Sequence, residues 1–576
     1  MISTAFFLLR EYQRFQSKRL LTELLWGVVS AFILTTSTIW IVYLITEGYE
    51  KSVPVTAVFS SIAIIAGLTF ILNQVMNYYN KVVKERYMLE AKAYFVQKVI
   101  KKTENIDLEA FYSSKFHDCY SLVFQCAQTK MEESLAIVFN FIFQLMALVN
   151  ALAAVSLINP ALLGFAIFIV LSTIAGNSLN KRLFKKNSSL INSGRKQELF
   201  FETLFQKETI FDLQTSDIGS CFQKYQSDNT KERLAITKSS ARALVPLKII
   251  VSQTSINLIY ISALLISLLS FYKIDEFKVS DFSILFSSVI LLLSRIKNCF
   301  KCYESFGSNR PYIEAYQDFG TQNTVRKKIA APFKSIAFEQ VDYQYPSSET
   351  ALLKNVTLTI NHGDKIAVIG ENGSGKSTFL NLLSGVLKPT AGEIIINENY
   401  NTKAYDLSSF SKIVQQDFFL YSIALKENIM GTSNHNERYK DLINESWFSI
   451  DQKYLNRPFG KEVSEEGVIL SGGEAQKIAI ARALFSDKDI LIFDEATSAM
   501  DKVSERLLFQ KLARTQPTWI FSVHNQELAR YANRIFYFKA GIIQEFRSMQ
   551  EYHAWSNQEV KMSTGTIEEG AHGDYL

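Results

Sequence analysis

The sequence predicts a multidomain protein in which an all-α membrane region of six helices precedes an α/β domain of the phosphate-loop (P-loop) class. Three observations predict this order. Five apolar runs between residues 24 and 272 are each long enough to cross a bilayer, which takes about 20 residues. A glycine-rich loop that contains Gly-Lys-Ser-Thr follows at residues 370–378. Short strands alternate with helices on both sides of this loop, as in an α/β core.

Length and composition limit the function classes. A chain of 576 residues exceeds a single hydrophobic core, and domains of about 100–200 residues predict three or four. A net charge of +5 is small for this length and argues against a nucleic-acid surface spread over the whole protein. The five cysteines fall in segments that we assign to the cytoplasm, so no disulfide framework is expected. Cys299 and Cys302 lack a second pair or a nearby histidine, which favours reduced thiols over zinc.

The five long apolar runs contain no formally charged residue. They are residues 24–45, 55–76, 135–158, 161–179 and 249–272. A sixth run, residues 282–294, is shorter and ends at Arg295. A basic cluster before the first run is expected to stay in the cytoplasm, and a nucleotide-binding domain also needs cytoplasmic ATP. The number of crossings must therefore be even, and we expect six.

Two long basic segments, residues 77–133 and 181–248, separate the apolar runs in pairs. Both show apolar residues at helical spacing, so we expect membrane helices prolonged into the cytoplasm. Reversals of the chain are expected near residues 113–118 and 207–211. A pair of separate soluble hairpins is the alternative interpretation.

The domain boundaries follow from changes in composition. We expect a membrane region at residues 1–310, a linker at 311–334, a nucleotide-binding cassette at 335–555 and a disordered polar tail at 556–576. The linker composition begins near residue 300 and includes the helix breakers Gly307, Pro311, Gly320 and Pro332. Strands are expected at residues 337–343 and 356–360, on either side of a polar turn.

The phosphate loop follows a predicted buried strand, residues 365–369, and precedes a predicted helix that includes residues 379–383. This context separates it from an ordinary glycine-rich turn. Glycines let backbone N–H groups surround phosphate oxygens, and the helix N-terminus adds partial positive charge. Lys376 is expected to reach the β- and γ-phosphates, and the Ser377 hydroxyl to coordinate Mg²⁺. The expected nucleotide contacts in the loop are Gly370, Asn372, Gly373, Ser374, Gly375, Lys376, Ser377 and Thr378.

A second nucleotide element is an apolar run that ends in Asp494 and Glu495, the first of them 118 residues after Lys376. We expect Asp494 to lie near the magnesium ion and Glu495 to polarise an attacking water as general base. Between the two elements, Ser471, Gly472 and Gly473 open a helix whose N-terminus can bind another anion. One γ-phosphate does not need two such helix ends in one chain, so a second subunit would explain the duplication.

These residues closely resemble the ATP-binding-cassette (ABC) family of P-loop NTPases. Residues 470–474 match its signature motif, with Glu474 where glutamine is usual, which adds a negative charge near phosphate. The resemblance implies that Ser471, Gly472, Gly473 and Glu474 bind nucleotide, that Tyr345 stacks on adenine, that Gln416 joins Ser377 and Asp494 around Mg²⁺, and that His524 assists Glu495 in catalysis as the switch histidine. Residues 498–501 match the D-loop.

The order of six spans and then a cassette resembles the exporter branch of the family, with one half-transporter per chain. Residues 107–112, 195–198 and 207–212 are similar to coupling regions of lantibiotic and other bacteriocin-peptide exporters. The resemblance implies a dimer, as homodimer or heterodimer, that uses ATP and Mg²⁺ to export a modified peptide across the cytoplasmic membrane, with its cassettes in the cytoplasm. It implies lipid and the exported substrate as partners and no nucleic acid. No processing peptidase is expected before the first span.

Three alternatives stay open at this point. Within transport, a lipid or multidrug exporter fits the same motifs and the same apolar membrane region. A soluble cassette ATPase that acts on DNA or ribosomes shares the nucleotide motifs but does not carry six spans. An ATP-gated channel or sensor fits the domain order, although the pair Glu495 and His524 favours hydrolysis.

Overall fold

The computed structural model describes residues 2–104, 106–158, 207–239, 279–320, 326–346, 348–433, 435–462, 464–522 and 526–557, together with residues 197, 203, 204 and 242. The chain divides into two units. Unit 1 comprises Met1–Ile106 and Ser114–Gln322, and unit 2 comprises Asp107–Ser113 and Asn323–Leu576. The short segment Asp107–Ser113 thus belongs to unit 2, although its neighbours along the chain belong to unit 1.

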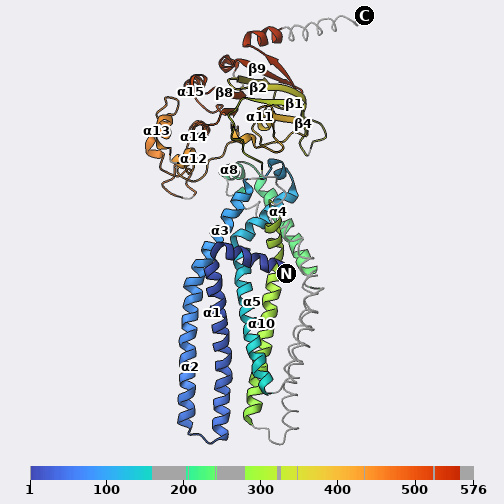
Figure 1. Cartoon of the computed structure of the whole chain (residues 1–576). Coiled ribbons are helices and arrows are strands. Elements are labelled where there is room, and N and C mark those ends of the chain that lie inside the picture. Colours follow the sequence, from blue (N-terminus) through green and yellow to red (C-terminus); the bar gives the residue numbers. More distant parts are fainter. Residues whose placement is uncertain are drawn as a thin grey trace, which may run out of the picture. The chain divides into compact units, whose positions relative to one another are not determined.

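The described part of unit 1 is helical (Figure 1). Its elements are α1 (Ile2–Glu50), α2 (Val55–Tyr78), η1 (Tyr79–Lys84), α3 (Glu85–Thr103), α4 (Ser114–Gln125), η3 (Cys126–Lys130), α5 (Met131–Ile158), α8 (Lys207–Thr215) and α10 (Val279–Asp318). The long helices α1, α2, α5 and α10 run lengthwise beside one another, with α1 packed against the other three. A kink at Gln16, where φ is −152°, separates the first turns of α1 from its apolar part.

Four of the six predicted spans fall on described residues, and all four are helical. Residues 24–45 lie in α1, 55–76 in α2, 135–158 in α5 and 282–294 in α10. By length and composition, the helical stretches Val55–Thr103 and Lys115–Ala153 can cross a membrane, and Leu21–Ile33 is a shorter apolar helix. The runs 161–179 and 249–272 lie outside the described residues, so the count of six stays a prediction.

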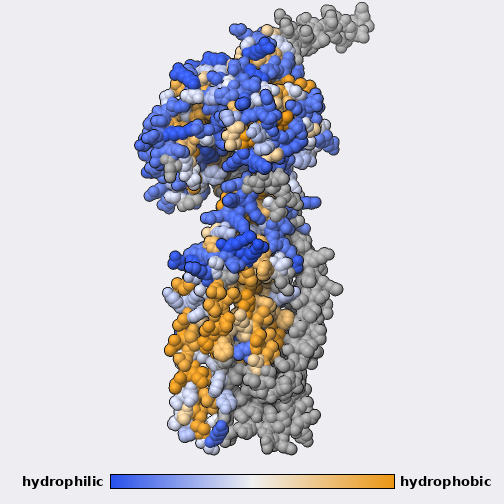
Figure 2. All heavy atoms as spheres, in the orientation of Figure 1, coloured by the Kyte–Doolittle hydropathy of each residue, from blue (hydrophilic) through white to orange (hydrophobic). Residues whose placement is uncertain are grey.

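The α2 helix shows how apolar this surface is. None of its residues is buried, and Phe59 and Phe70 are 69% and 63% exposed. Figure 2 shows hydrophobic residues gathered over the long helices of unit 1. A strongly apolar helix that packs against α1 but buries none of its own residues fits a lipid environment.

The helices continue past the apolar runs, as predicted. Helix runs without a break from Val55 to Thr103 and from Lys115 to Ala153, so the alternative of a separate soluble hairpin is wrong for residues 77–133. The first reversal falls at residues 104–113, slightly before the predicted position. Residues 207–211, where the second reversal is predicted, lie inside α8, and the described chain bends at Ser216 and Asp217 instead.

The predicted break near Gly307 and Pro311 does not occur, because α10 continues through both residues to Asp318. Phe306, Ile313 and Tyr316 on this part of α10 are fully buried, and Tyr316 packs edge-on against Phe95 of α3. An internal proline costs about 3 kcal/mol, whereas burying one large apolar side chain contributes about 1.5–3 kcal/mol. Long-range packing therefore overrides the local signal.

Unit 2 contains two sheets. The smaller sheet is antiparallel, with strand order β2-β1-β4-β5, and the larger sheet has the order β10-β9-β3-β8-β7-β6. In the larger sheet, β9, β3, β8, β7 and β6 are parallel and β10 is antiparallel to β9. The strands are β1 (Ser335–Tyr343), β2 (Leu353–Asn361), β3 (Lys365–Gly370), β4 (Ala391–Ile396), β5 (Tyr400–Asn401), β6 (Ser411–Val414), β7 (Ile490–Asp494), β8 (Thr518–Ser522), β9 (Arg534–Lys539) and β10 (Ile542–Phe546). The strands predicted from the sequence lie in β1, β2, β3 and β7.

The helices of unit 2 pack against these sheets. They are η2 (Leu108–Tyr112), α11 (Lys376–Leu383), η5 (Leu407–Ser409), α12 (Leu425–Met430), α13 (Asn436–Ile443), η6 (Gln452–Tyr454), α14 (Gly472–Phe485), α15 (Lys502–Thr515) and η7 (Gln526–Tyr531). One core joins Phe379 of α11 to Phe338 of the smaller sheet and Phe536 of the larger sheet. A second core packs α14 and α15 on the other side of the larger sheet, around Trp519 and Phe521. The α11 helix, which starts at the phosphate loop, is thus held between the two sheets.

The two ends of the cassette extend its predicted bounds slightly. Part of the predicted linker joins the cassette, since Lys327 N donates to Ala404 O at 3.0 Å and Asp406 N donates to Lys327 O at 2.9 Å. At the other end, residues 549–557 are helical. Residues 558–576, which include most of the predicted disordered tail, lie outside the described residues.

Candidate nucleotide site

The phosphate loop connects β3 to α11, and its glycines are required by close contacts. A Cβ atom at Gly370 would lie 2.5 Å from the backbone oxygen of Phe538. Gly375 has φ of +104°, and a Cβ atom there would lie 2.7 Å from Leu353 Cδ2. The loop therefore folds against the neighbouring strands with its backbone in a conformation that other residues adopt only with strain.

Lys376 places a positive charge inside this loop. Its side chain is 8% exposed, and Nζ donates to the backbone oxygens of Gly370 at 2.8 Å and Glu371 at 3.0 Å. The Ser374 hydroxyl is buried without a hydrogen-bond partner. A buried ammonium and an unsatisfied hydroxyl at a helix N-terminus fit the oxygens of a phosphate group.

Two cavities adjoin the loop. One has a volume of about 360 Å³ and is lined by Leu352, Asn372, Gly373, Gly375, Lys376, Ser377, Thr378, Gln416 and Glu495. The other has a volume of about 300 Å³ and is lined by Tyr345, Ser348, Thr350, Ala351, Leu352, Gly373, Ala540 and Gly541. Both are lined by Leu352 and Gly373, so the two cavities are neighbours; we call them together the nucleotide trough, with an aromatic end at Tyr345 and a phosphate-loop end at Lys376. The trough matches the two ends of a nucleoside triphosphate.

Tyr345 at the aromatic end is fixed from three sides. Its hydroxyl lies 3.1 Å from Thr378 Oγ1, and its ring meets the rings of Tyr343 and Tyr112 edge-on at centroid distances of 5.0 and 5.6 Å. Burial raises the pKa of Tyr112, and the neighbouring Tyr345 adds to this effect. The predicted adenine-stacking residue is thus in direct contact with the η2 segment.

The carboxylates at the end of β7 are positioned by a residue that the sequence did not point to. Ser522, at the end of the neighbouring β8, donates from Oγ to Asp494 Oδ1 at 2.8 Å. The same Oγ accepts from Glu495 N at 2.8 Å. Asp494 is 5% exposed, and Glu495 has φ of +49°, which is a strained conformation for this residue type. One hydroxyl therefore ties the carboxylate of Asp494, the predicted Mg²⁺ ligand, to the backbone of Glu495, the predicted general base.

The signature segment caps the N-terminus of α14. Ser471 Oγ accepts from Glu474 N at 3.3 Å, and Glu474 Oε2 accepts from both Ser471 N and Ser471 Oγ at 2.8 Å. This is a reciprocal capping box, which satisfies backbone donors at the helix start. The single proton of the Ser471 hydroxyl points at a carboxylate oxygen, and the Glu474 charge lies where an anion is expected to bind.

The same helix is locked onto the D-loop. A Cβ atom at Gly473 would lie 2.7 Å from Ala499 O. Gln476 accepts from Ala499 N at 2.9 Å and donates to Ser498 Oγ at 3.2 Å. Asp501 caps the start of α15, where its side chain accepts from the backbone N of Ser504. Hydrogen bonds from Ser504 hold the pKa of the Asp501 carboxyl at about 2. The signature helix and the D-loop therefore move as one body.

The segment after Gln416 is tied to the other end of the signature helix. Arg482 of α14 donates to the backbone oxygen of Phe419 at 3.0 Å, and to the backbone and side-chain oxygens of Asn428 at 2.7 and 2.9 Å. Asn428 in turn donates to Tyr421 O and accepts from Tyr421 N, both at 2.9 Å. The stretch from Phe419 to Asn428, which follows Gln416 in the chain, is therefore fixed to α14 by hydrogen bonds.

The η2 segment binds the cassette through charges as well as through Tyr112. Asp107 accepts from Lys388 Nζ at 2.7 Å and from Arg326 at 3.4 Å. Leu108 packs against the core around α11. Since η2 joins the end of α3 to the start of α4, it links the long helices to the aromatic end of the nucleotide trough.

The structure brings most of the predicted loop residues together and leaves others apart. Eight predicted site residues line the phosphate cavity: Asn372, Gly373, Gly375, Lys376, Ser377, Thr378, Gln416 and Glu495. Gly370 and Ser374 form the loop itself, and Asp494 does not line the cavity but directly precedes Glu495, which does. Ser471, Gly472, Gly473 and Glu474 do not line this cavity. His524 lies outside the described residues. The individual roles stay predictions.

Mg²⁺ fits this arrangement. The Ser377 hydroxyl and the Gln416 amide line the phosphate cavity, and the buried Asp494 directly precedes Glu495, which also lines it. All three offer the oxygen ligands that Mg²⁺ prefers. Bound there, the ion would neutralise phosphate charge during hydrolysis.

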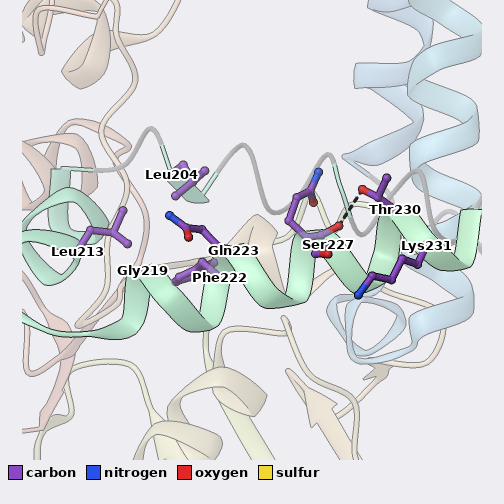
Figure 3. Close-up of a pocket in the computed structure, with 9 residues that line it drawn as sticks. Leu204, Leu213, Gly219, Phe222, Gln223, Ser227, Thr230 and Lys231 are labelled. Carbon is purple, nitrogen blue, oxygen red and sulfur yellow. Dashed lines mark hydrogen bonds between the residues drawn. The ribbon is translucent and has the colours of Figure 1, made fainter.

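A third cavity, of about 610 Å³, lies in unit 1 along the helix at residues 218–239 (Figure 3). Its described lining combines Leu213, Phe222 and Leu204 with amide and hydroxyl side chains, and it includes one charged residue, Lys231. Thr230 Oγ1 donates to the backbone oxygen of Gln226 at 2.8 Å, which is the usual bond of a helical threonine to the carbonyl four residues earlier. The described lining contains no carboxylate, histidine or cysteine, whereas the nucleotide trough is lined by both Lys376 and Glu495, so we take the trough as the candidate catalytic site.

Comparison with known proteins agrees with this site. Residues 353–498 match the family model described as ABC transporter, and this region spans the phosphate loop, the signature segment and the β7 carboxylates. The nucleotide-binding part of unit 2 is therefore an ATP-binding-cassette domain.

Similarity also extends beyond the cassette. The chain is 32% identical over 233 residues to the subtilin transport ATP-binding protein SpaT of Bacillus subtilis, covering 38% of this chain and 37% of that protein. It is 28% identical over 396 residues to the ATP-dependent lipid A-core flippase of Wigglesworthia glossinidia brevipalpis, covering 65% of this chain and 66% of that protein. In both cases the match spans less than two thirds of the relative's own length.

A solved structure of a bacterial Atm1-family ABC exporter with ATP bound has the same fold. The TM-score is 0.76 at 17% sequence identity, and the superposition covers 97% of this chain and 99% of that chain. The chain thus has the fold of an ABC exporter half-transporter, one helical membrane region followed by one ATP-binding cassette.

Proposed function

We propose that this chain hydrolyses ATP to drive export of a modified peptide across the plasma membrane, as one half of a dimer with its cassettes in the cytoplasm. The exporter fold, the cassette and the similarity to the subtilin transport protein support this proposal. The apolar α2, which buries none of its own residues, supports a multi-pass location in the membrane.

The observation that carries the proposal is the separation of two anion-binding helix ends in one cassette. The phosphate cavity at the start of α11 is not lined by Ser471–Glu474 at the start of α14. The signature end therefore needs a nucleotide held by another cassette. Ile469 and Val503, which flank the signature segment and the D-loop, are each 70% exposed and offer an apolar seam for a second half-transporter.

Within this chain, the residues of the trough perform the hydrolytic half of the cycle. Lys376 and the loop N–H groups bind phosphate, and Glu495 orients and deprotonates the attacking water. Ser522 holds Glu495 and Asp494 at fixed positions. Tyr112 and Asp107 pass changes at the trough to α3 and α4 through η2. Local charge changes at the phosphate thus bias a two-state arrangement of the long helices.

Export of a lipid is the second candidate function, and a specific observation favours it. The match to the lipid A-core flippase runs over 396 residues, whereas the match to the subtilin transport protein runs over 233. The longer match includes part of the membrane region, where a substrate would be bound.

Replacement of Glu495 by glutamine tests the proposal. We expect Glu495→Gln to abolish ATP turnover while ATP binding persists, because the amide keeps the shape of the side chain and loses the base. Glu398→Gln, in an exposed turn of the same unit, is the matched control and should hydrolyse ATP at the parental rate. Turnover and ATP binding are measured on purified protein in proteoliposomes. Parental turnover by Glu495→Gln, or turnover by strict monomers, would show the proposal to be wrong.

A matched substrate panel then separates the two candidates. ATPase stimulation is measured in the same proteoliposomes with apolar peptides and with lysolipids. Stimulation by peptides supports peptide export, and stimulation by lysolipids alone supports the lipid flippase.

A further inference from the structure

Arg295 is a charged residue placed inside the membrane region. It follows the apolar run 282–294 on α10, sixteen residues after the helix begins at Val279. The apolar run before it has thirteen residues, or about 20 Å of helix at about 1.5 Å per residue, which is shorter than a hydrocarbon layer about 30 Å thick. None of the six apolar runs contains Asp or Glu. The membrane runs themselves therefore offer Arg295 no carboxylate partner.

The contacts of Arg295 leave part of its guanidinium unsatisfied. Nη1 donates to Gln144 Oε1 of α5 at 3.3 Å, and Gln144 Nε2 donates to Asn140 Oδ1 at 3.3 Å. Arg295 Nε is buried without a hydrogen-bond partner. Within the part of the chain that the structure describes, no ion pair joins Arg295 to an acid. The result is a row of polar groups with one unpaired positive charge.

A structural role explains this arrangement less well. Long basic side chains near a membrane surface normally extend their charge to water, and Lys297, two residues further along α10, is exposed in this way. Arg295 instead lies against Gln144, which is 8% exposed. Arg295 is half-buried, with its Nε fully buried, and holding a cation in such a place without a counter-ion is unfavourable, so ionisable residues in membrane helices usually serve a substrate or ion path.

We propose that Arg295 and Gln144 form a subsite that binds an anionic group of the exported molecule. A guanidinium offers N–H donors in a planar fork, which pairs with a carboxylate or a phosphate through two parallel hydrogen bonds. Nε and one Nη supply these donors, and the Gln144 amide orients the fork. For a peptide substrate the anionic group is a carboxylate. This assignment rests on the proposed function above and adds a substrate contact to it.

The test compares matched anionic and neutral probes on the full chain in nanodiscs. One pair is an apolar peptide with a free C-terminal carboxylate and the same peptide as its amide. The second pair is lysophosphatidic acid and the monoacylglycerol with the same chain. The half-maximal concentration for ATPase stimulation is measured for each probe. For the parent, we expect the anionic member to act at a concentration lower by about tenfold or more, as for a charge-assisted hydrogen bond.

Three variants assign the effect. Arg295→Gln should bring the ratio of neutral to anionic half-maximal concentrations close to one, with the neutral probe as internal reference for folding. Arg295→Lys, which keeps the charge and loses the fork, should give an intermediate ratio and covers the case in which Arg295→Gln fails to fold. Lys297→Gln should keep the parental ratio and the parental basal turnover.

The outcomes are decisive in each direction. A parent that hydrolyses ATP but treats both members of each pair alike overturns the subsite while leaving the exporter proposal intact. Discrimination that persists in Arg295→Gln overturns it as well. Discrimination of the lysolipid pair alone, lost in Arg295→Gln, supports the anion subsite and overturns its assignment to a peptide carboxylate.

Discussion

Replacing Ser522 by alanine removes one hydroxyl group from the candidate catalytic site. In the native chain this hydroxyl donates to Asp494 Oδ1 and accepts from Glu495 N, each at 2.8 Å. The substitution leaves no cavity larger than a single oxygen atom, and it leaves every nucleotide-contacting side chain in place. Any loss of activity therefore reports on the positioning of the two carboxylates.

The magnitude follows from these two hydrogen bonds. A hydrogen bond to a charged group contributes about 1.5–3 kcal/mol, and a buried N–H group left unsatisfied costs about 1–3 kcal/mol. The Glu495 backbone is already strained at φ of +49°, so the loss of its N–H partner releases it from the catalytic position. If the substitution raises the activation free energy of hydrolysis by about 1.5–3 kcal/mol, turnover falls roughly 10- to 100-fold.

The assay is ATP hydrolysis by purified protein as a function of Mg²⁺ concentration at saturating ATP. We expect Ser522→Ala to lower kcat and to raise the Mg²⁺ concentration at half-maximal rate, because Asp494 loses its orienting donor. Ser411→Ala is the matched control: this serine is also buried at 5% exposure, but its hydroxyl contacts backbone oxygens of Ser384 and Leu407 at 3.3 Å. Equal kcat and equal Mg²⁺ dependence in Ser522→Ala and the parent would refute the reasoning. An equal loss of kcat in Ser411→Ala would show that the effect of Ser522→Ala comes from lower stability and not from the positions of the carboxylates.

Three further predictions concern residues outside the carboxylate pair. Glu474→Gln should raise ATP turnover a few-fold, since the amide caps α14 without a negative charge facing phosphate; turnover at or below the parental rate contradicts this. Lys388→Ala should weaken substrate stimulation of the ATPase a few-fold by removing an ion pair of about 0.2–1 kcal/mol to η2, while Lys403→Ala, which loses a surface pair with Glu393, should not. Burial raises the pKa of the Cys126 thiol from 9.0 to about 12, so the thiol has no pH-dependent effect on stability well below pH 9.0, and stability falls as the pH rises from 9.0 towards about 12 because the unfolded thiol ionises first. At about pH 8.5, near the ordinary thiol pKa, mass spectrometry should find iodoacetamide on the exposed Cys221 and none on Cys126.

The parts of the fold that the sequence predicted well are those defined by local pattern. The strand, loop and helix around Lys376 follow from a run of apolar residues, closely spaced glycines and a helix start. The apolar run before Glu495 likewise predicted β7. In these segments the local preferences and the tertiary packing favour the same conformation, so a short window of sequence is sufficient.

The missed features depend on contacts between distant residues. Pro311 lies inside a helix because Ile313 and Tyr316 beside it are buried against segments far away in the chain. Ser522 is an unremarkable serine at the end of an apolar run. Its partner Asp494 lies directly opposite it in the parallel register of β7 and β8. The apolar run at residues 518–521 before Ser522 is the signal that could have found it, because the carboxyl ends of neighbouring parallel strands lie at one edge of a sheet.

The surface of the cassette includes η2, a segment that precedes the rest of the cassette by more than 200 residues in the chain. Asp107 and Lys388 are 281 residues apart in the chain, and the intervening residues form much of unit 1. During synthesis, η2 emerges from the ribosome before the part of the cassette that it binds. The contact between Asp107 and Lys388 therefore forms late. A truncated cassette that starts at residue 323 would expose the apolar surface that Leu108 covers and would lose the tyrosine packed against Tyr345. Rates measured on such a fragment would describe a domain with part of its own surface missing.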